Sequence, residues 1–176
     1  MPDRFIKKIF PLLAILLLTP WPVAYAHTYT GDMVGQESVQ IEVAEASAAP
    51  SMTVFGKAIG GVRPGDLFYI DATENAADIT VTLYLTNSQE LCHCYRFLIL
   101  KVGIYVESAG GEWEKASWCD AKPIPETFIT LCDAQVSFTL PGCTKHKVTI
   151  DSGSFYCIRT QADGGTVSPQ LYLTVN

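Results

Sequence analysis

The residues from Ile79 to Thr86 alternate strictly between apolar and polar side chains, and this alternation constrains the fold more than any other feature. The apolar positions are Ile79, Val81, Leu83 and Leu85. A period of two built from β-branched and aromatic residues is typical of a strand that buries one face. We therefore expect the chain to be organised around antiparallel strands.

The segments on either side of this strand carry related signals. Before it, Arg63-Pro64-Gly65-Asp66 is typical of a turn, and the short apolar run Leu67–Ile70 follows. After it, Cys92-His93-Cys94 is expected to return the chain to β structure, and the residues from Phe97 to Val106 are almost wholly apolar. A run that is apolar on both sides predicts a central strand covered on both faces.

Further short strands are predicted at Val39–Val43, Met52–Gly56, Phe128–Leu131, Gln135–Leu140, Lys147–Ile150, Ser154–Thr160 and Leu171–Val175. The turns between strands are expected at Gly60-Gly61, Ser108–Gly111, Pro141-Gly142, Asp151–Gly153 and Asp163–Gly165. No segment of about twelve residues keeps a helical period. About nine to eleven short strands at regular spacing predict an all-β fold, an antiparallel Ig-like β-sandwich over residues 51–176.

The first 26 residues have the features of a secretory signal peptide. A basic start is followed by an apolar segment from Ile9 to Leu18 and by the cleavage pattern Ala24-Tyr25-Ala26. The apolar segment is too short to span a bilayer and is broken up by Pro11, Pro20 and Pro22, which disfavours a membrane anchor. We expect a secreted, extracellular protein with no membrane insertion after cleavage; retention at the cell surface or in the periplasm stays open.

Charge narrows the class of partner. Cleavage removes three of the twelve basic residues and one of the eighteen acidic ones, so the formal net charge changes from −6 to −8. An acidic chain of this kind is unsuited to nucleic acid or to an anionic membrane. We therefore expect neither as a partner.

All six cysteines lie in the exported part of the chain: Cys92, Cys94, Cys119, Cys132, Cys143 and Cys157. An even number in an oxidising compartment predicts three disulfides. Two cysteines two apart on one strand point the same way, so Cys92 and Cys94 should each reach a different partner. A zinc site at Cys-His-Cys is the rival interpretation, but zinc sites generally place two to four residues between the cysteines.

Residues 27–50 are predicted to form an N-terminal arm that contains one strand. Val39, Ile41 and Val43 alternate with polar residues, and a loose segment from Ala44 to Pro50 joins them to the body. This strand is either the first strand of the sandwich or an exchangeable strand that pairs with the open sheet edge of a neighbouring molecule.

Trp113 and Trp118 lie among charged residues in a segment flanked by turns. Aromatic rings in such a segment stack on sugars, which makes both tryptophans candidate glycan contacts. The alternative is that they cap one end of the core next to Cys119.

The sequence contains candidate ligands for two metals, copper and calcium. If cleavage follows Ala26, His27 offers an α-amine and an imidazole together, and His146 would add a second imidazole, with Phe155 or Tyr156 as the axial neighbour. Nitrogen ligands of this kind suit copper. The arrangement resembles the histidine brace of copper-dependent polysaccharide monooxygenases and CopC-like copper carriers, which implies copper binding.

Calcium is the second metal to consider, because hard cations take clustered oxygen ligands. The candidate ligands are Asp71, Glu74, Asn75 and Asp78. Their spacing departs from an EF-hand loop, and a solvated polar turn is the alternative.

Two short segments resemble known families. The run from Asp151 to Cys157 is similar to the D-x-G-x-Y-x-C pattern of immunoglobulin F strands, although Phe155 replaces the expected Tyr and Tyr156 is displaced by one position. The segment from Val62 to Leu85, which opens with the Pro-Gly-Asp turn, resembles secreted matrix-fibre proteins of the TasA and camelysin kind. The second resemblance implies a structural subunit of extracellular fibres, without catalytic residues.

No catalytic motif stands out in the sequence. The chain contains no G-x-S-x-G elbow, no H-E-x-x-H pattern and no phosphate-binding glycine pattern. We expect a non-catalytic structural or adhesive module without a cofactor, which associates with itself or with other cell-surface proteins. A glycan-binding module and a copper-binding protein are the alternatives.

Overall fold

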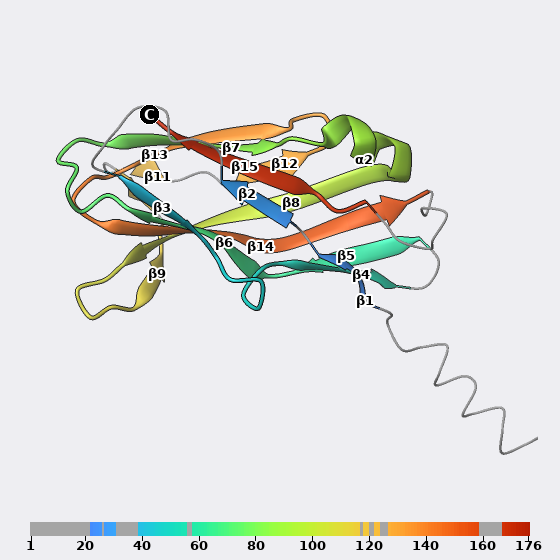
Figure 1. The fold of residues 1–176 in the computed structure, drawn as a ribbon, viewed down its shortest axis with the longest axis horizontal. Helices are drawn as coiled ribbons and strands as arrows, with labels where there is room; N and C mark the ends of the chain where they lie inside the picture. Colours follow the sequence, from blue (N-terminus) through green and yellow to red (C-terminus); the bar gives the residue numbers. More distant parts are fainter. Residues whose placement is uncertain are drawn as a thin grey trace, which may run out of the picture.

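The computed structural model describes residues 22–25, 27–30, 39–55, 58–116, 118–119, 122–123, 127–158 and 167–176, and side chains within 39–53, 58–116, 127–158 and 167–176. In this part of the chain two β-sheets pack face to face, with a short helix at one end (Figure 1). The predicted all-β architecture of two mainly antiparallel layers is therefore confirmed.

The larger sheet contains nine of the described strands. They are β1 (Pro22–Tyr25), β3 (Gln40–Val43), β4 (Ser51–Phe55), β5 (Ile59–Arg63), β6 (Gly65–Asp71), β8 (Tyr95–Glu107), β9 (Trp113–Lys115), β12 (Thr127–Thr130) and β14 (Lys145–Cys157). The long strands β8 and β14 pair antiparallel and form the centre of the sheet. On the edge of β14 that faces away from β8, β6 pairs with the first part of β14 and β5 with the last part. On the edge of β8 that faces away from β14, β12 pairs with the middle of β8 and β9 with its end.

The smaller sheet has the order β13 (Gln135–Leu140), β7 (Ile79–Leu85), β15 (Gln170–Val175) and β2 (His27–Thr30). Its strands pair antiparallel except for β15 and β2, which run parallel. A separate two-stranded ladder joins β10 (Trp118–Cys119) to β11 (Lys122–Pro123).

The core lies between the two sheets and follows the period-two alternation. The alternating segment forms β7, whose apolar side chains Ile79, Val81 and Leu83 are fully buried. The larger sheet presents buried residues to them, including Phe68, Ile70, Leu98, Leu100, Val148, Ile150 and Phe155. Burial of each large aliphatic or aromatic side chain contributes about 1.5–3 kcal/mol, so this double layer is the main source of stability.

The turn predicted at Arg63–Asp66 is wrong. Strand β5 ends at Arg63 and β6 begins at Gly65, yet both pair antiparallel with β14, so the chain continues in the same direction. Pro64 lacks an N–H and therefore interrupts the hydrogen-bond ladder without reversing the chain. Glycine is needed at position 65 because a Cβ there would collide with the backbone at Pro50.

Two other predicted turns are also strands. Asp151–Gly153 forms a β-bulge inside the continuous strand β14, where the register with β8 shifts between Ile150 and Ser152. Gly60-Gly61 lies within β5. A Cβ at Gly60 would collide with the ring of Phe155, so this glycine makes room for a core side chain rather than ending a strand.

The segment containing Cys92 and Cys94 is helical rather than extended. It forms α2 (Ser88–Cys94), which buries Leu91 before β8 begins. Asn87 precedes the helix, and its side chain bonds Ser168 O and Gln170 N at 2.9 Å each, which ties the helix start to β15. In the described part of the chain, no helix is long and apolar enough to cross a membrane.

The predicted disulfides receive no support from the structure. No disulfide forms among the cysteines whose side chains are described, and Cys119 lies outside that set. Residues two apart on a helix point in different directions, so the argument that Cys92 and Cys94 share one face does not hold. Cys92, Cys132 and Cys143 are exposed at different connections, in α2, after β12 and after β13.

The predicted arm strand lies in its own molecule's sheet. Strand β3 pairs antiparallel with β6, and the N–H of Ala44 donates to Leu67 O at 2.9 Å. Val39 is fully buried, while Ile41 and Val43 pack partly against the core. This is the arrangement expected of an ordinary strand of the sandwich; exchange with a second molecule stays a prediction.

Candidate functional site

A groove of about 310 Å³ lies on the outer face of the larger sheet beside β9. Figure 1 shows the β8–β9 hairpin extending beyond the body of the sheet, so β9 forms a wall next to it. Tyr69 and Asp71 line the groove and alternate along β6 with the buried Phe68 and Ile70. The pleat of β6 therefore turns the side chains of Tyr69 and Asp71 away from the core, and the buried Ile70 between them also borders the groove.

Trp113 supplies the aromatic wall. It is half-buried and sits opposite Glu107, at the point where the hairpin turns. The turn is closed by a bond from Ser108 N to Glu112 O at 2.8 Å, and Gly111 adopts a φ of 79°, which favours glycine. This tight turn places Trp113 next to the sheet.

Two side chains hold the Trp113 ring in place. The ring of Tyr69 lies 5.9 Å away, centroid to centroid, at an angle of 48°. Lys147 Nζ lies 5.3 Å from the Trp113 centroid and 5.4 Å from that of Tyr105, both within the range of a cation–π contact. The indole is therefore fixed before any ligand arrives.

Asp66 contacts both of the side chains that pack against Trp113. The hydroxyl of Tyr69 donates to Asp66 Oδ2 at 2.6 Å, and Lys147 Nζ lies 3.3 Å from Asp66 Oδ1. Burial, followed by the hydrogen bond to Asp66, raises the pKa of Tyr69 to about 12. Tyr69 thus stays a neutral donor at physiological pH and keeps its ring beside Trp113.

A second cluster forms around the bulged residue Asp151. It pairs with Lys115 of β9 and accepts bonds from Tyr105 at 3.1 Å and Thr149 at 2.7 Å. Partial burial by itself would raise the pKa of Asp151, but these bonds outweigh it and hold the pKa below its usual value. A Cβ at Gly103 would collide with Asp151, so the cluster also requires glycine there.

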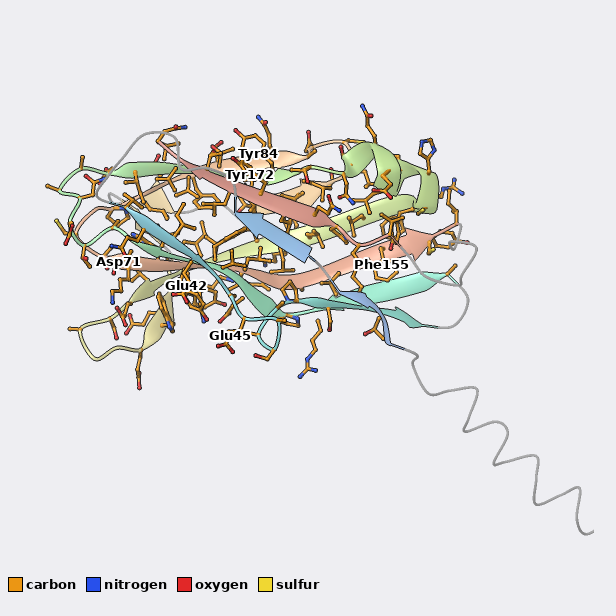
Figure 2. The ribbon with its side chains drawn as sticks, viewed as in Figure 1. Glu42, Glu45, Asp71, Tyr84, Phe155 and Tyr172 are labelled. Atoms are coloured by element: carbon orange, nitrogen blue, oxygen red, sulfur yellow. The ribbon has the colours of Figure 1, made fainter. Side chains whose placement is uncertain are left out.

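Charged groups surround the remaining edge of the groove. Lys145 Nζ lies 3.7 Å from Asp71 and 3.9 Å from Glu107, and Glu42 of β3 adds a third carboxylate. Bonds from the hydroxyl and N–H of Thr73 lower the pKa of Asp71. Figure 2 shows Glu42 and Asp71 on the larger sheet, away from Tyr84 and Tyr172 of the smaller one.

This arrangement combines an aromatic wall with carboxylate, ammonium and amide groups, the last from Gln40. Such a set suits a ligand that has an apolar face and several hydroxyl groups, because the ring covers the first and the polar groups bond the second. Three carboxylates and one ammonium disfavour a polyanionic ligand.

The structure places one of the two predicted glycan contacts in the groove, and glycan binding by either stays a prediction. Trp113 lies in the groove and is half-buried, so it borders solvent rather than capping the core. Trp118 is part of β10, and its side chain, like that of Cys119, lies outside the described residues.

His146 is buried on the core side of β14 and is 1% exposed. Its Nε2–H donates to Pro141 O at 2.8 Å, and its Nδ1 has no partner in the described structure. Burial lowers the pKa of His146. His27 belongs to β2, but its side chain lies outside the described residues, so the copper site stays a prediction.

The candidate calcium ligands form a hydrogen-bonded turn. Asp71 accepts from Thr73, and Asn75 Oδ1 accepts from Ala77 N at 3.2 Å. Glu74 and Asp78 are exposed. Among the described residues, no group of three or more His, Cys, Asp or Glu side chains gathers in a way that would hold a metal ion.

Sequence reasoning missed most of the groove. Tyr69 lies inside an apolar run of the sequence. The sign that its side chain faces outward is Asp71, a polar residue two positions further along the same strand. Glu42 was interpreted as the polar side of an arm strand. Glu107 and Lys145 carried no local signal, because they meet only through the pairing of β8 with β14.

No protein-family model and no curated protein matches the chain. Among solved structures, CpGH89CBM32-6 produced by Clostridium perfringens superposes with a TM-score of 0.29 at 11% identity, covering 77% of this chain and 92% of the other. The CBM22-1 xylan-binding domain from Paenibacillus barcinonensis gives a TM-score of 0.24 at 11% identity, covering 78% and 83%. The K1 cleaved adhesin domain of Lys-gingipain from Porphyromonas gingivalis gives 0.21 at 12% identity, covering 69% and 89%. TM-scores of this size carry no argument about function.

Proposed function

We propose that this protein is a non-catalytic, extracellular glycan-binding module that holds a sugar in the groove beside Trp113. The observation that carries the proposal is the half-buried Trp113 ring, fixed by Tyr69 and Lys147 at the wall of a groove edged with polar groups. A preorganised ring loses little conformational freedom on binding, which favours affinity. An adhesive role follows, since the sequence predicts export.

The groove chemistry narrows the sugar class. Glu42, Asp71 and Glu107 outnumber Lys145, and the whole chain is acidic. Repulsion therefore disfavours chains of uronic acids, while neutral and amino sugars meet carboxylate acceptors for their hydroxyl and amino groups. We propose neutral or amino-sugar oligosaccharides as the ligand.

Isothermal titration calorimetry with neutral, amino-sugar and uronic-acid oligosaccharides tests this function. We expect saturable binding of a neutral or amino sugar, weakened about tenfold or more by Trp113→Ala, which corresponds to about 1.4 kcal/mol. Phe128→Ala is the matched control, because Phe128 is an aromatic side chain, 43% exposed, on β12 of the same sheet and outside the groove. If no oligosaccharide binds, or if both variants bind equally, the proposal is wrong.

A further inference from the structure

We propose that the outer face of the smaller sheet is a second glycan-binding surface, suited to an uncharged extended polysaccharide. The idea that this chain binds glycans rests on the function proposed above, but the residues are different. The two surfaces lie on opposite sides of the shared core, so each is tested by its own variants.

The surface is built around one register row. Gln135, Tyr84 and Tyr172 lie directly opposite one another on β13, β7 and β15. The rings of Tyr84 and Tyr172 are 6.2 Å apart at an angle of 49°. On β2, Tyr29 occupies the register position opposite Tyr172, so the row of backbone positions crosses all four strands.

A second row contributes hydroxyl groups. Ser137, Thr82 and Thr174 lie opposite one another on the same three strands, and Thr82 Oγ1 and Ser137 Oγ share a hydrogen bond of 2.8 Å. Thr174 Oγ1 is buried and has no hydrogen-bond partner in the described structure. Thr82 is buried as well, so the hydroxyl that this row offers to a ligand is that of the exposed Ser137.

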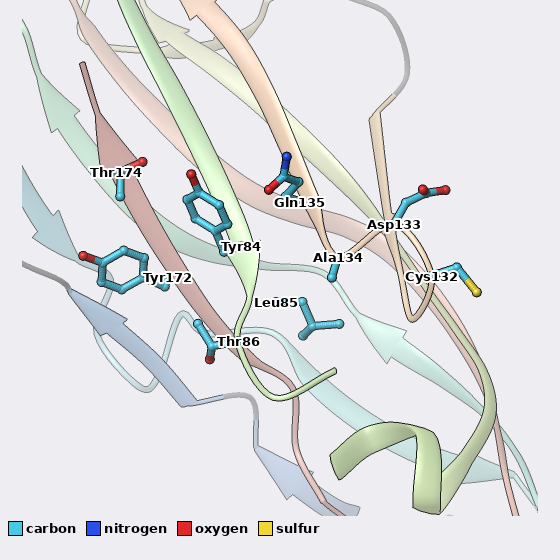
Figure 3. A pocket seen from close by; sticks show the side chains of 9 residues that line it. All are labelled: Tyr84, Leu85, Thr86, Cys132, Asp133, Ala134, Gln135, Tyr172 and Thr174. Atoms are coloured by element: carbon cyan, nitrogen blue, oxygen red, sulfur yellow. The ribbon is translucent and has the colours of Figure 1, made fainter. Parts of the chain in front are cut away.

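A wide, open depression of about 900 Å³ runs along this face (Figure 3). Tyr84, Tyr172, Thr174 and Gln135 line it, and the single charged side chain among its described lining residues is Asp133 at one end. Rings, hydroxyls and an amide without a charged set match the alternating apolar and hydroxyl groups of a neutral sugar chain.

A protein partner is the less suitable occupant. The large apolar side chains that are most exposed in the described chain are Ile59, Phe97, Ile99, Phe128 and Ile158. None of these belongs to the strands that form the smaller sheet. Protein interfaces generally centre on an apolar cluster, which this face lacks among its described residues.

Affinity gel electrophoresis of the folded chain in gels containing hydroxyethyl cellulose, galactomannan or dextran tests the inference, with polygalacturonate as the charged comparison. We expect at least one neutral polymer to retard the protein. The double variant Tyr84→Ala with Tyr172→Ala should weaken that binding about tenfold, or about 1.4 kcal/mol. The double variant Tyr84→Phe with Tyr172→Phe keeps both rings and should retain most of the affinity, which separates stacking from misfolding.

Each outcome decides between the two proposals. Loss of retardation in the alanine pair but not in Trp113→Ala supports the second surface alone. Loss in Trp113→Ala but not in the alanine pair overturns the second surface and leaves the groove intact. If no neutral polymer retards the protein, or if polygalacturonate retards it equally, the inference is overturned.

Discussion

The outer face of the larger sheet and the outer face of the smaller sheet have the same strand periodicity but opposite chemistry. On the larger sheet, Lys115, Lys147, Asp66 and Asp151 form ion pairs among aromatic rings. On the smaller sheet, the two rows centred on Tyr84 and Thr82 hold rings and hydroxyls and no charge. The pleat determines only which side chains point outward. The chemistry of those side chains determines how each face responds to salt, pH and ligands.

The largest expected effect comes from Gly103→Val, which disrupts the Asp151 cluster on the charged face. The new side chain would collide with Asp151 and Thr149, so the carboxylate must move away from Lys115 and Tyr105. We expect a loss of about 2–3 kcal/mol in the free energy of unfolding, measured by urea denaturation.

Gly110→Ala is the matched control for this variant, because the nearest atom to a Cβ there is Ser108 Oγ at 3.9 Å. It should change the free energy of unfolding by less than about 0.5 kcal/mol. Equal effects of the two substitutions would contradict the packing of Asp151 over Gly103.

Asp151→Ala should have the next largest effect. It removes the acceptor of Tyr105 and Thr149 and the ion-pair partner of Lys115, whose side chain is 53% exposed and therefore adds little. We expect a loss of about 1–2 kcal/mol in urea denaturation. If Asp151→Ala is as stable as the unsubstituted protein, the cluster does not hold β9 to the sheet.

Acidification should weaken the protein in two steps. Because burial lowers the pKa of His146, the unfolded chain binds a proton that the folded chain resists, and stability falls as pH drops below about 6.5. The folded state also lowers the pKa values of Asp151 and Asp71, so these ionised carboxylates contribute stability. This contribution is lost below about pH 4, as they become protonated. Thermal unfolding measured from about pH 7.5 down to about pH 2.5 covers both steps.

His146→Gln should remove the first step and leave the second. His93→Gln is its control, because it makes the same substitution at a histidine that is exposed on α2. A first step that survives in His146→Gln would assign it to another group.

The smallest effect is expected on the uncharged face. Thr82→Val removes the hydrogen bond to Ser137 and should cost less than about 1 kcal/mol. Raising salt from about 0.05 M to about 0.5 M should shrink the difference between Asp151→Ala and the unsubstituted protein but not the difference caused by Thr82→Val. Equal salt dependence of the two differences would remove the distinction between the faces.

Sequence patterns predicted the core well and the outer surfaces poorly. The alternation at Ile79–Leu85 correctly identified the four apolar side chains that β7 buries, although Thr82 is buried as well. Local turn signals failed at Pro64 and Asp151, because the pairing of β5 and β6 with β14, and of β14 with β8, overrides what a short segment prefers alone. Cys92–Cys94 was expected to be a strand, but these residues complete a helix that begins at Ser88. The helix is too short to show a helical period in the sequence.

The candidate groove was predictable only at Trp113. Its other residues come from strands far apart in sequence, such as Glu42 in β3 and Lys145 in β14, and they meet through register rather than through spacing. The uncharged face shows the same limit, since the row of Gln135, Tyr84 and Tyr172 exists only once three strands are paired.

Nuclear magnetic resonance titration of the labelled protein with a neutral or amino-sugar oligosaccharide tests the central claim most directly. We expect saturable shifts of the Trp113 indole N–H and of the backbone of Tyr69 and Glu42, which lie along the groove. The shifts of Tyr69 and Glu42 should disappear in Trp113→Ala, and all three should remain in Phe128→Ala. Saturable binding that leaves Trp113 unshifted, or shifts that persist in Trp113→Ala, would contradict a glycan site in this groove.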